Sequence, residues 1–228
     1  MAVRASVIQG FLVHAQAIEE HNFMCALLSP TLGLIRCKFH RQHPEFFRQF
    51  EIKLKETNQF YSCHDFRYTQ TLLIDSSPAR LYGLYLNELV YRLVPTQVDI
   101  DNFFGTYIST LIQLQADNHR LANLRFFEKQ LLVHIGLGID YLMSVNGVAI
   151  HAQHRYHFEA GQGFCEQATG AFKGEAILAN ARSDYEVKGA LATARECQHQ
   201  QLLMALDNEP ILSREWLKTL PVQSEANK

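Results

Sequence analysis

Residues 81–95 read LYGLYLNELVYRLVP, and this stretch marks where the chain changes character. Its apolar residues leave almost no polar face, which is typical of a helix buried inside a domain. Ser77 can cap this helix, Pro78 suits its first position, and the final proline ends it. Asn87 and Glu88 lie in its middle. An unpaired buried carboxylate is costly, so we expect both residues to have hydrogen-bonding partners.

Short strands fill the part of the chain before this helix. Apolar runs near residues 7–14, 23–28 and 34–39 precede a strict alternation over 51–56 and a fifth run over 59–69. Five short strands favour a small closed barrel, and the five-stranded OB-fold is the commonest such solution. An SH3-like barrel is the alternative. We therefore predict an OB-fold domain over residues 1–76.

Helices dominate the rest of the chain. The spacing of apolar residues predicts helices over residues 99–114, 122–135, 186–206 and 213–218. Residues 140–172 lose the helical period and read as a loop that contains a strand. The predicted fold class is therefore α+β. A five-stranded OB-fold barrel precedes an all-helical domain over residues 77–228, which carries a small irregular or strand insert.

Composition and motifs argue against several classes of protein. Hydrophobic residues make up 47% of the chain and charged residues 19%, the balance of a folded protein and not a disordered one. No apolar run reaches the roughly 18 residues that span a bilayer. The first residues lack the apolar core of a signal peptide, so we expect a cytoplasmic protein. Motifs of common hydrolases, nucleotide-binding enzymes and zinc peptidases are missing, so we expect no enzyme and no catalytic residues.

Cysteines and histidines suggest one weak candidate for a metal site. The five cysteines are scattered without a Cys-x-x-Cys pair, which fits a reducing compartment. His151, His154, His157 and Cys165 carry the imidazole and thiolate groups that bind zinc. However, only one thiol is present, and in a strand His154 would point away from the other two histidines. A solvated, His-rich loop is the alternative, and we expect neither a metal nor another cofactor.

Basic residues share the polar faces of two predicted strands. Arg36 and Lys38 lie on one face of residues 34–39, and Lys53 and Lys55 on one face of residues 51–56. Cations beside aromatic platforms suit sequence-tolerant binding of single-stranded nucleic acid. Lysine is also common on any solvated strand face, so these residues alone leave both interpretations open. The candidate DNA-binding residues are Arg36, Lys38, Arg41, Arg48, Lys53, Lys55 and Arg67, and the candidate platforms are Phe39, Phe60, Tyr61, Phe66 and Tyr68.

Four segments follow one another along the chain: GFLVH at residues 10–14 with the two strands that follow, LYGLYLNEL at 81–89, LRFFEKQLLVHIG at 124–136 and LSREWL at 212–217. In this order they resemble the RecO family of bacterial recombination mediators. Together they span nearly the whole chain. The resemblance implies an N-terminal OB-fold followed by a helical domain, in agreement with the patterns above.

The family resemblance also implies a function. It implies a protein of DNA repair and homologous recombination that binds single- and double-stranded DNA and anneals complementary strands. Such a protein acts with RecR to load the recombinase RecA onto strands coated by single-strand-binding protein, and it is cytoplasmic and nucleoid-associated. The net charge of −2 and a short polar connection over residues 40–44, where the family carries a basic loop, keep an alternative open. That alternative is a protein-interaction scaffold of the same pathway with weak DNA affinity.

Two further sites follow from the resemblance. The family binds the acidic C-terminal tail of single-strand-binding protein on its helical domain, and an arginine beside an apolar groove suits a terminal carboxylate. The candidate partner-binding residues are Leu121, Leu124, Arg125 and Leu132. An ion pair between Arg125 and Glu128 is the alternative. Many members also carry a four-cysteine zinc module, whose positions correspond here to Met143, Asn146, Cys165 and Ala168. We therefore expect a degenerate module over residues 140–172.

Histidines near the predicted barrel can add positive charge when protonated. The candidates are His14, His40, His43 and His64. Because histidine titrates near pH 6.5, we expect the affinity for single-stranded DNA to rise as the pH falls from about 7.5 to about 6.

Overall fold

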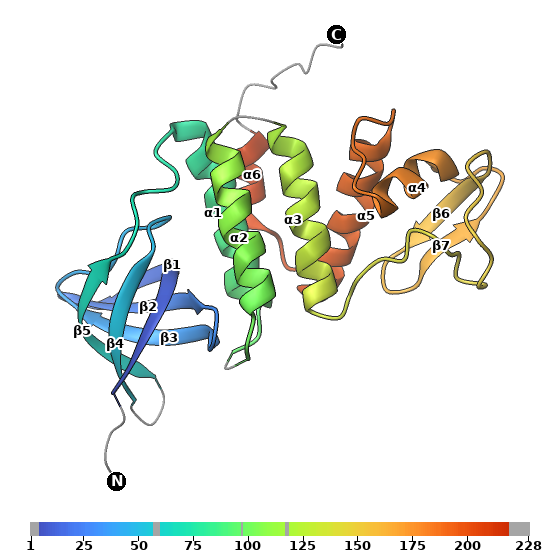
Figure 1. The fold of residues 1–228 in the computed structure, drawn as a ribbon. Coiled ribbons are helices and arrows are strands. Elements are labelled where there is room, and N and C mark those ends of the chain that lie inside the picture. Colours follow the sequence, from blue (N-terminus) through green and yellow to red (C-terminus); the bar gives the residue numbers. More distant parts are fainter. Residues whose placement is uncertain (1–4, 57–59, 97, 117–118, 219–228) are drawn as a thin grey trace. The chain divides into compact units, whose positions relative to one another are not determined.

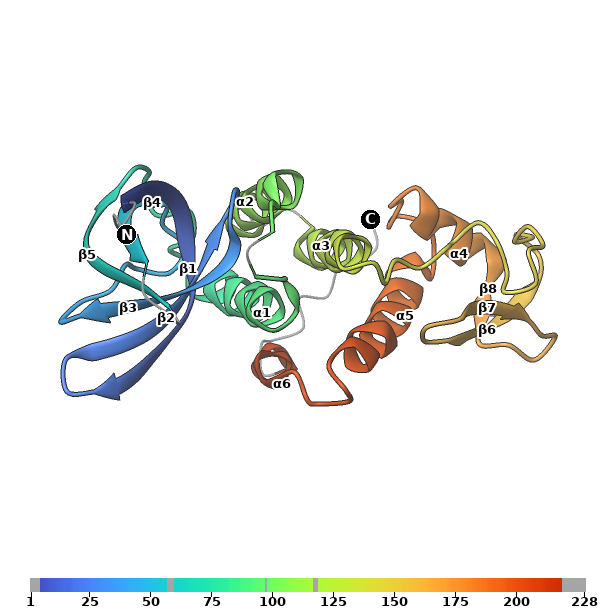
Figure 2. The same cartoon turned by 90° about the horizontal axis from the view of Figure 1, so that it is seen from below.

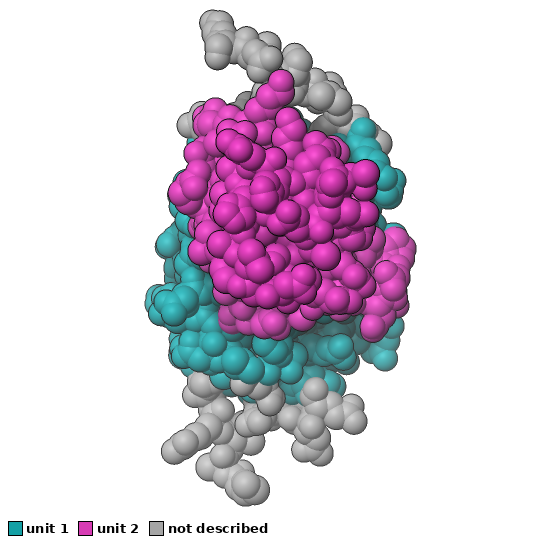
Figure 3. Space-filling view, turned by 90° about the vertical axis from the view of Figure 1, so that its right-hand side faces the viewer, with its two compact units in different colours: residues 1–117, 211–228 teal, residues 118–210 magenta. Residues whose placement is uncertain are grey.

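The computed structural model describes residues 5–56, 60–96, 98–116 and 119–218 (Figure 1). The chain divides into two compact units, which Figure 3 colours separately. Unit 1 combines Met1–Asp117 with Ile211–Lys228, and unit 2 is Asn118–Pro210. The predicted boundary after residue 76 falls where strands give way to helices, whereas the compact units divide the chain after residue 117 and again before residue 211.

Five strands of unit 1 form a closed barrel. They are β1 (Ala5–Glu19), β2 (Asn22–Ser29), β3 (Gly33–His40), β4 (Phe50–Glu56) and β5 (Tyr61–Tyr68). Their order around the barrel is β1-β2-β3-β5-β4. The first half of the long strand β1 pairs with β4 and its second half with β2, which closes the sheet. The predicted five-stranded, OB-like barrel is confirmed.

The barrel core contains three cysteines among aliphatic and aromatic side chains. Cys25, Cys37 and Cys63 are all buried, with Leu27 and Phe50 among their neighbours in the core. Burial, followed by the nearby Cys63, raises the pKa of Cys25 to about 12. These thiols therefore act as small apolar groups.

Helix α1 (Ser77–Leu93) contains the stretch quoted first and packs against β1. The ring of Tyr91 stacks on His14 with centroids 4.2 Å apart. Gly83 has a packing role, because a Cβ there would lie 2.6 Å from a ring carbon of Phe47. The cap differs from the prediction by one residue: Ser76 occupies the N-cap, and its side chain makes no capping hydrogen bond.

The polar pair inside α1 is hydrogen-bonded, as predicted. Asn87 accepts a hydrogen bond of 2.7 Å from the hydroxyl of Tyr107 in α2 (Asp101–Gln115). Glu88 accepts bonds from the backbone amides of Leu212 and Ser213, at 2.9 and 2.7 Å, at the start of α6 (Leu212–Lys218). Figure 2 shows α1 between α2 and α6. A helix from the far end of the sequence thus belongs to unit 1.

Unit 2 packs helices beside a small sheet. Its helices are α3 (Arg120–His134), α4 (Gly174–Ala181) and α5 (Ala190–Ala205), and its strands are β6 (Arg155–Glu159), β7 (Gly163–Glu166) and β8 (Phe172–Lys173) in the order β7-β6-β8. The predicted helical region with a strand insert is confirmed. The predicted helix over residues 186–206 starts later, at Ala190 after Gly189, whose φ is 87°. Helix α4 was not predicted, because eight residues are too few to show a clear period.

No helix in the described ranges is both long enough and apolar enough to cross a membrane.

Candidate nucleic-acid interface

Strand order places β5 between the two strands that carry the predicted basic residues. Ser62 of β5 pairs with Lys38 of β3 on one side and with Lys55 of β4 on the other. Directly paired residues face the same side of a sheet. The adjacent residues Cys37 and Leu54 belong to the barrel core, so the three paired residues face outward. Neighbouring strands lie about 4.8 Å apart, which separates the Cα atoms of the two lysines by about 10 Å.

Arg36 and Lys53 extend this row in opposite directions. Each lies two residues before a lysine of the row and is exposed on the same outer face. Strand β3 runs parallel to β5, whereas β4 runs antiparallel to it. The step from Lys38 to Arg36 and the step from Lys55 to Lys53 therefore point opposite ways along β5. We call this set the diagonal stripe; its members are Arg36, Lys38, Lys55 and Lys53.

Only one cation of the diagonal stripe has an ion pair within the described residues. Lys38 lies 4.0 Å from Glu19, whose side chain is 69% exposed. Arg36, Lys53 and Lys55 make no ion pair with any residue in the described part of the chain. Such solvent-facing cations are available to an anionic ligand.

Two other predicted DNA-binding residues already have partners. Arg67 donates from Nε and Nη2 to one oxygen of Glu51, at 2.8 and 2.5 Å. Hydrogen bonds from Arg67 and then Gln9 hold the pKa of Glu51 below its ordinary value. Arg48 lies 3.8 Å from the centre of the Tyr68 ring and donates to a backbone carbonyl at 3.2 Å.

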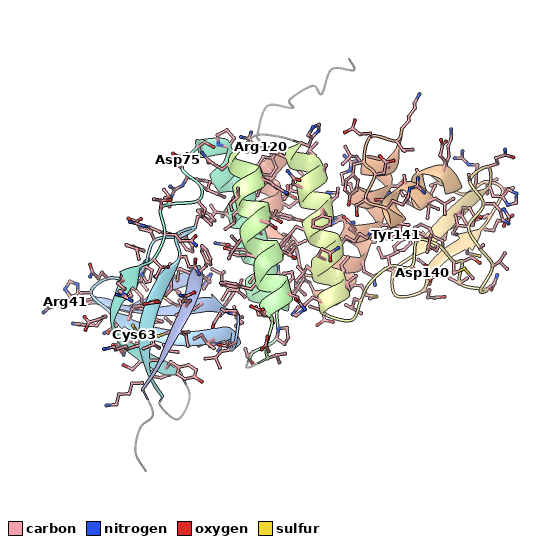
Figure 4. All side chains as sticks on the ribbon, in the orientation of Figure 1. Arg41, Cys63, Asp75, Arg120, Asp140 and Tyr141 are labelled. Carbon is pink, nitrogen blue, oxygen red and sulfur yellow. The ribbon has the colours of Figure 1, made fainter. Side chains whose placement is uncertain are left out.

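Arg41 lies apart from these groups, at the end of β3 (Figure 4). Its φ is 69°, and its backbone amide donates to the carbonyl of His21 at 2.6 Å. Its side chain is exposed.

Of the five predicted aromatic platforms, Phe39 is buried in the barrel core, so the prediction is wrong for this residue. Tyr61, Phe66 and Tyr68 are partly buried and pack against that core. Alternation explains this: a residue between two outward-facing neighbours of a strand must face inward. Phe60 precedes β5 and is partly buried.

The histidines differ in what surrounds them. His14 is stacked on Tyr91, and burial lowers its pKa, so it stays neutral more readily than an exposed histidine. His40 is exposed on the same face of β3 as Lys38, with Nδ1 3.3 Å from Asn22 Oδ1. His43 Nδ1 lies 2.8 Å from the carbonyl of Pro44. The His64 side chain lies outside the described residues.

Comparison with known proteins identifies the family. Residues 78–185 match the family model described as Recombination protein O C terminal. The chain is 35% identical over 220 residues to the DNA repair protein RecO of Stutzerimonas stutzeri, covering 92% of this chain and 93% of that protein. This chain belongs to the RecO family of DNA repair proteins. It is also 28% identical over 215 residues to the RecO protein of Pseudomonas entomophila, covering 90% and 94% of the two chains.

The residues expected to bind a protein tail in the RecO family lie on α3 but differ in exposure. Arg125 is 9% exposed, and its Nη1 lies 2.9 Å from Oε2 of the buried Glu128. Leu124 and Leu132 are also buried, whereas Leu121 is 44% exposed. The guanidinium therefore meets Glu128, as in the alternative interpretation. Tail binding by this set stays a prediction.

The zinc module that the family resemblance implies does not fit the residues of this chain. Val145 donates to the carbonyl of Phe164 at 2.8 Å, which places the turn carrying Met143 and Asn146 beside β7 and its Cys165. A thioether, an amide, one thiol and the methyl group of Ala168 do not form a zinc donor set. Across the residues with described positions, no three His, Cys, Asp or Glu side chains gather to hold a metal.

An apolar core lies in this part of the RecO fold. Tyr141, Tyr156, Phe158 and Phe164 are buried together with Ile150, Ile177 and Cys197. The histidines near it stay at the surface: His157 pairs with Cys165 across β6 and β7, and His154 Nδ1 lies 3.0 Å from Glu166. The observed contacts thus account for the insert without a metal.

Proposed function

We propose that this protein is a non-enzymatic mediator of DNA repair and homologous recombination that binds single-stranded DNA on the outer face of its barrel. The observation that carries the proposal is the diagonal stripe of cations on β3 and β4, which lie on both sides of β5. Membership of the RecO family supports the same pathway. In this role the protein anneals complementary strands and, with RecR, helps to load RecA onto strands coated by single-strand-binding protein.

The number of cations in the diagonal stripe sets the expected strength of binding. One phosphate per cation gives the upper limit, a slope of log K against log salt of about −2.8 for single strands, since each phosphate contributes about −0.7. Without exposed aromatic platforms along the strands, the phosphate contacts supply most of the affinity. We therefore expect weak binding that is lost at high salt.

A titration of labelled single-stranded DNA at two salt concentrations, with and without single-strand-binding protein, tests the proposal. The expected results are saturable binding at low salt, a steep loss at high salt, and faster annealing of complementary strands when the protein is added. Absence of binding at low salt, together with unchanged annealing, would exclude a direct role on DNA.

A scaffold with weak DNA affinity is the second candidate function. The pairing of Arg67 with Glu51 and the stacking of Arg48 on Tyr68 favour it, because these contacts occupy two of the seven predicted DNA-binding residues. The scaffold would bind RecR and single-strand-binding protein but would not accelerate annealing. Pull-down of both proteins without annealing activity would support this function over the first.

The acidic tail of single-strand-binding protein is the partner that we propose for α3. Leu121 is the exposed member of the predicted set and lies one helical turn from Arg125. An Arg125→Ala variant would remove the ion pair of the buried Glu128, so its folding must be checked first. Leu121→Ser avoids this problem. The expected result is weaker binding of a labelled tail peptide by both variants; unchanged affinity in a folded Arg125→Ala variant would remove the proposal.

A further inference from the structure

We infer that the sugar-phosphate backbone of single-stranded DNA crosses the β3-β5-β4 face along the diagonal stripe, with one phosphate held jointly by Lys38, Ser62 and Lys55. This inference rests on the proposed function and adds the path of the strand and a neutral contact at its centre. None of the three residues indicates a phosphate site on its own. Their juxtaposition comes from two pairings of the same serine, one parallel and one antiparallel.

The central row offers three donors to one anion. Each lysine has a flexible four-carbon stem and three ammonium hydrogens. Stems of that length, rooted about 10 Å apart, can bring both ammonium groups over the strand between them. The Ser62 hydroxyl lies on that middle strand and can donate a further hydrogen bond. A phosphate over Ser62 would thus accept charge-assisted bonds from both sides and a neutral bond from below.

The outer members of the stripe give the path its direction. Two residues along a strand correspond to about 6.6 Å, so Arg36 and Lys53 each lie about one such step from the row. Because they lie on opposite sides of it, a backbone that contacts all four cations must run diagonally across the three strands. It cannot run parallel to any one of them.

The same geometry separates stripe residues from their basic neighbours. Arg67 and Arg48 face their own partners, Glu51 and the Tyr68 ring. Glu19 is the one acidic group within 4.0 Å of a stripe cation among the described residues. An exposed pair of this kind contributes about 0–1 kcal/mol, so a phosphate can displace it. Glu19→Gln is therefore expected to tighten binding.

Salt dependence of binding to labelled oligothymidylate, measured on the full-length chain, tests the inference. Lys38→Gln/Lys55→Gln should reduce the magnitude of the log K against log salt slope by about 0.7, because the two lysines hold one phosphate and about 0.7 is lost for each phosphate contact. Ser62→Ala should weaken binding by roughly three- to tenfold with no change in slope, since it removes a neutral hydrogen bond. Circular dichroism and the melting temperature confirm that each variant is folded.

The charge-matched control is Lys173→Gln/Lys188→Gln, which removes two exposed cations from unit 2. Its slope should equal that of the wild type. A normal slope in Lys38→Gln/Lys55→Gln, or a slope change in the control of the size expected for the stripe, overturns the inference while leaving DNA binding in place.

Failure of the proposed function has a different signature. If the wild-type protein binds no single-stranded DNA at low salt, the proposed function fails, and duplex DNA then serves as the probe. If Lys38→Gln/Lys55→Gln has a smaller slope of log K against log salt on duplex DNA than the wild type, the stripe binds phosphates of a different ligand. If the protein binds neither nucleic acid, the inference that the stripe binds a phosphate backbone is overturned as well.

Discussion

At the scale of single residues, Glu88 joins the two chain segments that make up unit 1. Its carboxylate accepts hydrogen bonds from Leu212, Ser213 and Arg92, and its side chain is 17% exposed. Burial raises its pKa, but the bonds from Ser213, Leu212 and Arg92 outweigh burial, so the pKa lies below its ordinary value. Because folding lowers the pKa, the ionised carboxylate stabilises the fold at pH values above its ordinary pKa. This stabilisation is lost as the pH falls through the lowered pKa of the folded chain. The contribution is therefore complete at neutral pH.

Replacing this carboxylate tests its role. Glu88→Gln keeps the size but presents amide hydrogens to backbone donors, so we expect a loss of about 2–4 kcal/mol in the free energy of unfolding. Ser213→Ala removes one donor and should cost about 1–2 kcal/mol. Urea denaturation measures both. Glu20→Gln, at a side chain that is 91% exposed, is the control and should stay within about 0.5 kcal/mol of the wild type.

The lowered pKa of His14 predicts that the folded protein loses stability in acid. Burial lowers its pKa in the folded chain, so the unfolded chain binds the proton more readily. Stability is then lost as the pH falls below the ordinary value of about 6.5. His14→Phe keeps a ring on Tyr91 without a titrating group, and its melting temperature should fall less between pH 7.5 and pH 5.5. His134 also has a pKa lowered by burial, so some acid loss should remain. Parallel pH profiles for variant and wild type would contradict the prediction.

At the scale of elements, local patterns predicted the strands but not their neighbours. Alternation placed Lys53 and Lys55 on one face, as observed. It failed to give the full length of β1, whose register shifts near Leu12 and Ala17 interrupt the period of two. Ser62 carried no signal of its own, because its importance depends on β3 and β4 both pairing with β5. Strand order is a tertiary property that a period along the chain does not contain.

The insert between α3 and α4 is expected to need no metal. Its sheet packs on Tyr141, Tyr156 and Phe164, and the four positions of the zinc module lack a donor set. The purified protein should therefore contain less than stoichiometric zinc by elemental analysis, and a chelator should leave its melting temperature unchanged. A melting temperature that falls in chelator and recovers on addition of zinc would contradict the prediction.

At the scale of the whole molecule, the two compact units meet at positions in the chain that the amino-acid composition does not mark. The sequence predicted a boundary after residue 76, where strands end and helices begin. The compact units place α6 in unit 1, where hydrogen bonds join residues that are 124 and 125 positions apart. No linker composition signals this arrangement, because hydrogen bonds between one partly buried carboxylate and two backbone amides join the segments. Asn87 and Glu88 were the sequence signal, since a buried polar pair must have partners somewhere in the fold.

Truncation after Pro210 should therefore weaken unit 1 and spare unit 2. The shortened chain loses every partner of Glu88 on α6 and leaves this carboxylate without its backbone donors. Hydrogen–deuterium exchange should become faster in α1, while α5 keeps its protection because its contacts with α3 and α4 lie within unit 2. Adding Glu88→Gln to the truncated chain should cost less than adding it to the full chain, because both changes remove the same bonds. Faster exchange in α5 at unchanged exchange in α1 would show that α6 stabilises unit 2 instead.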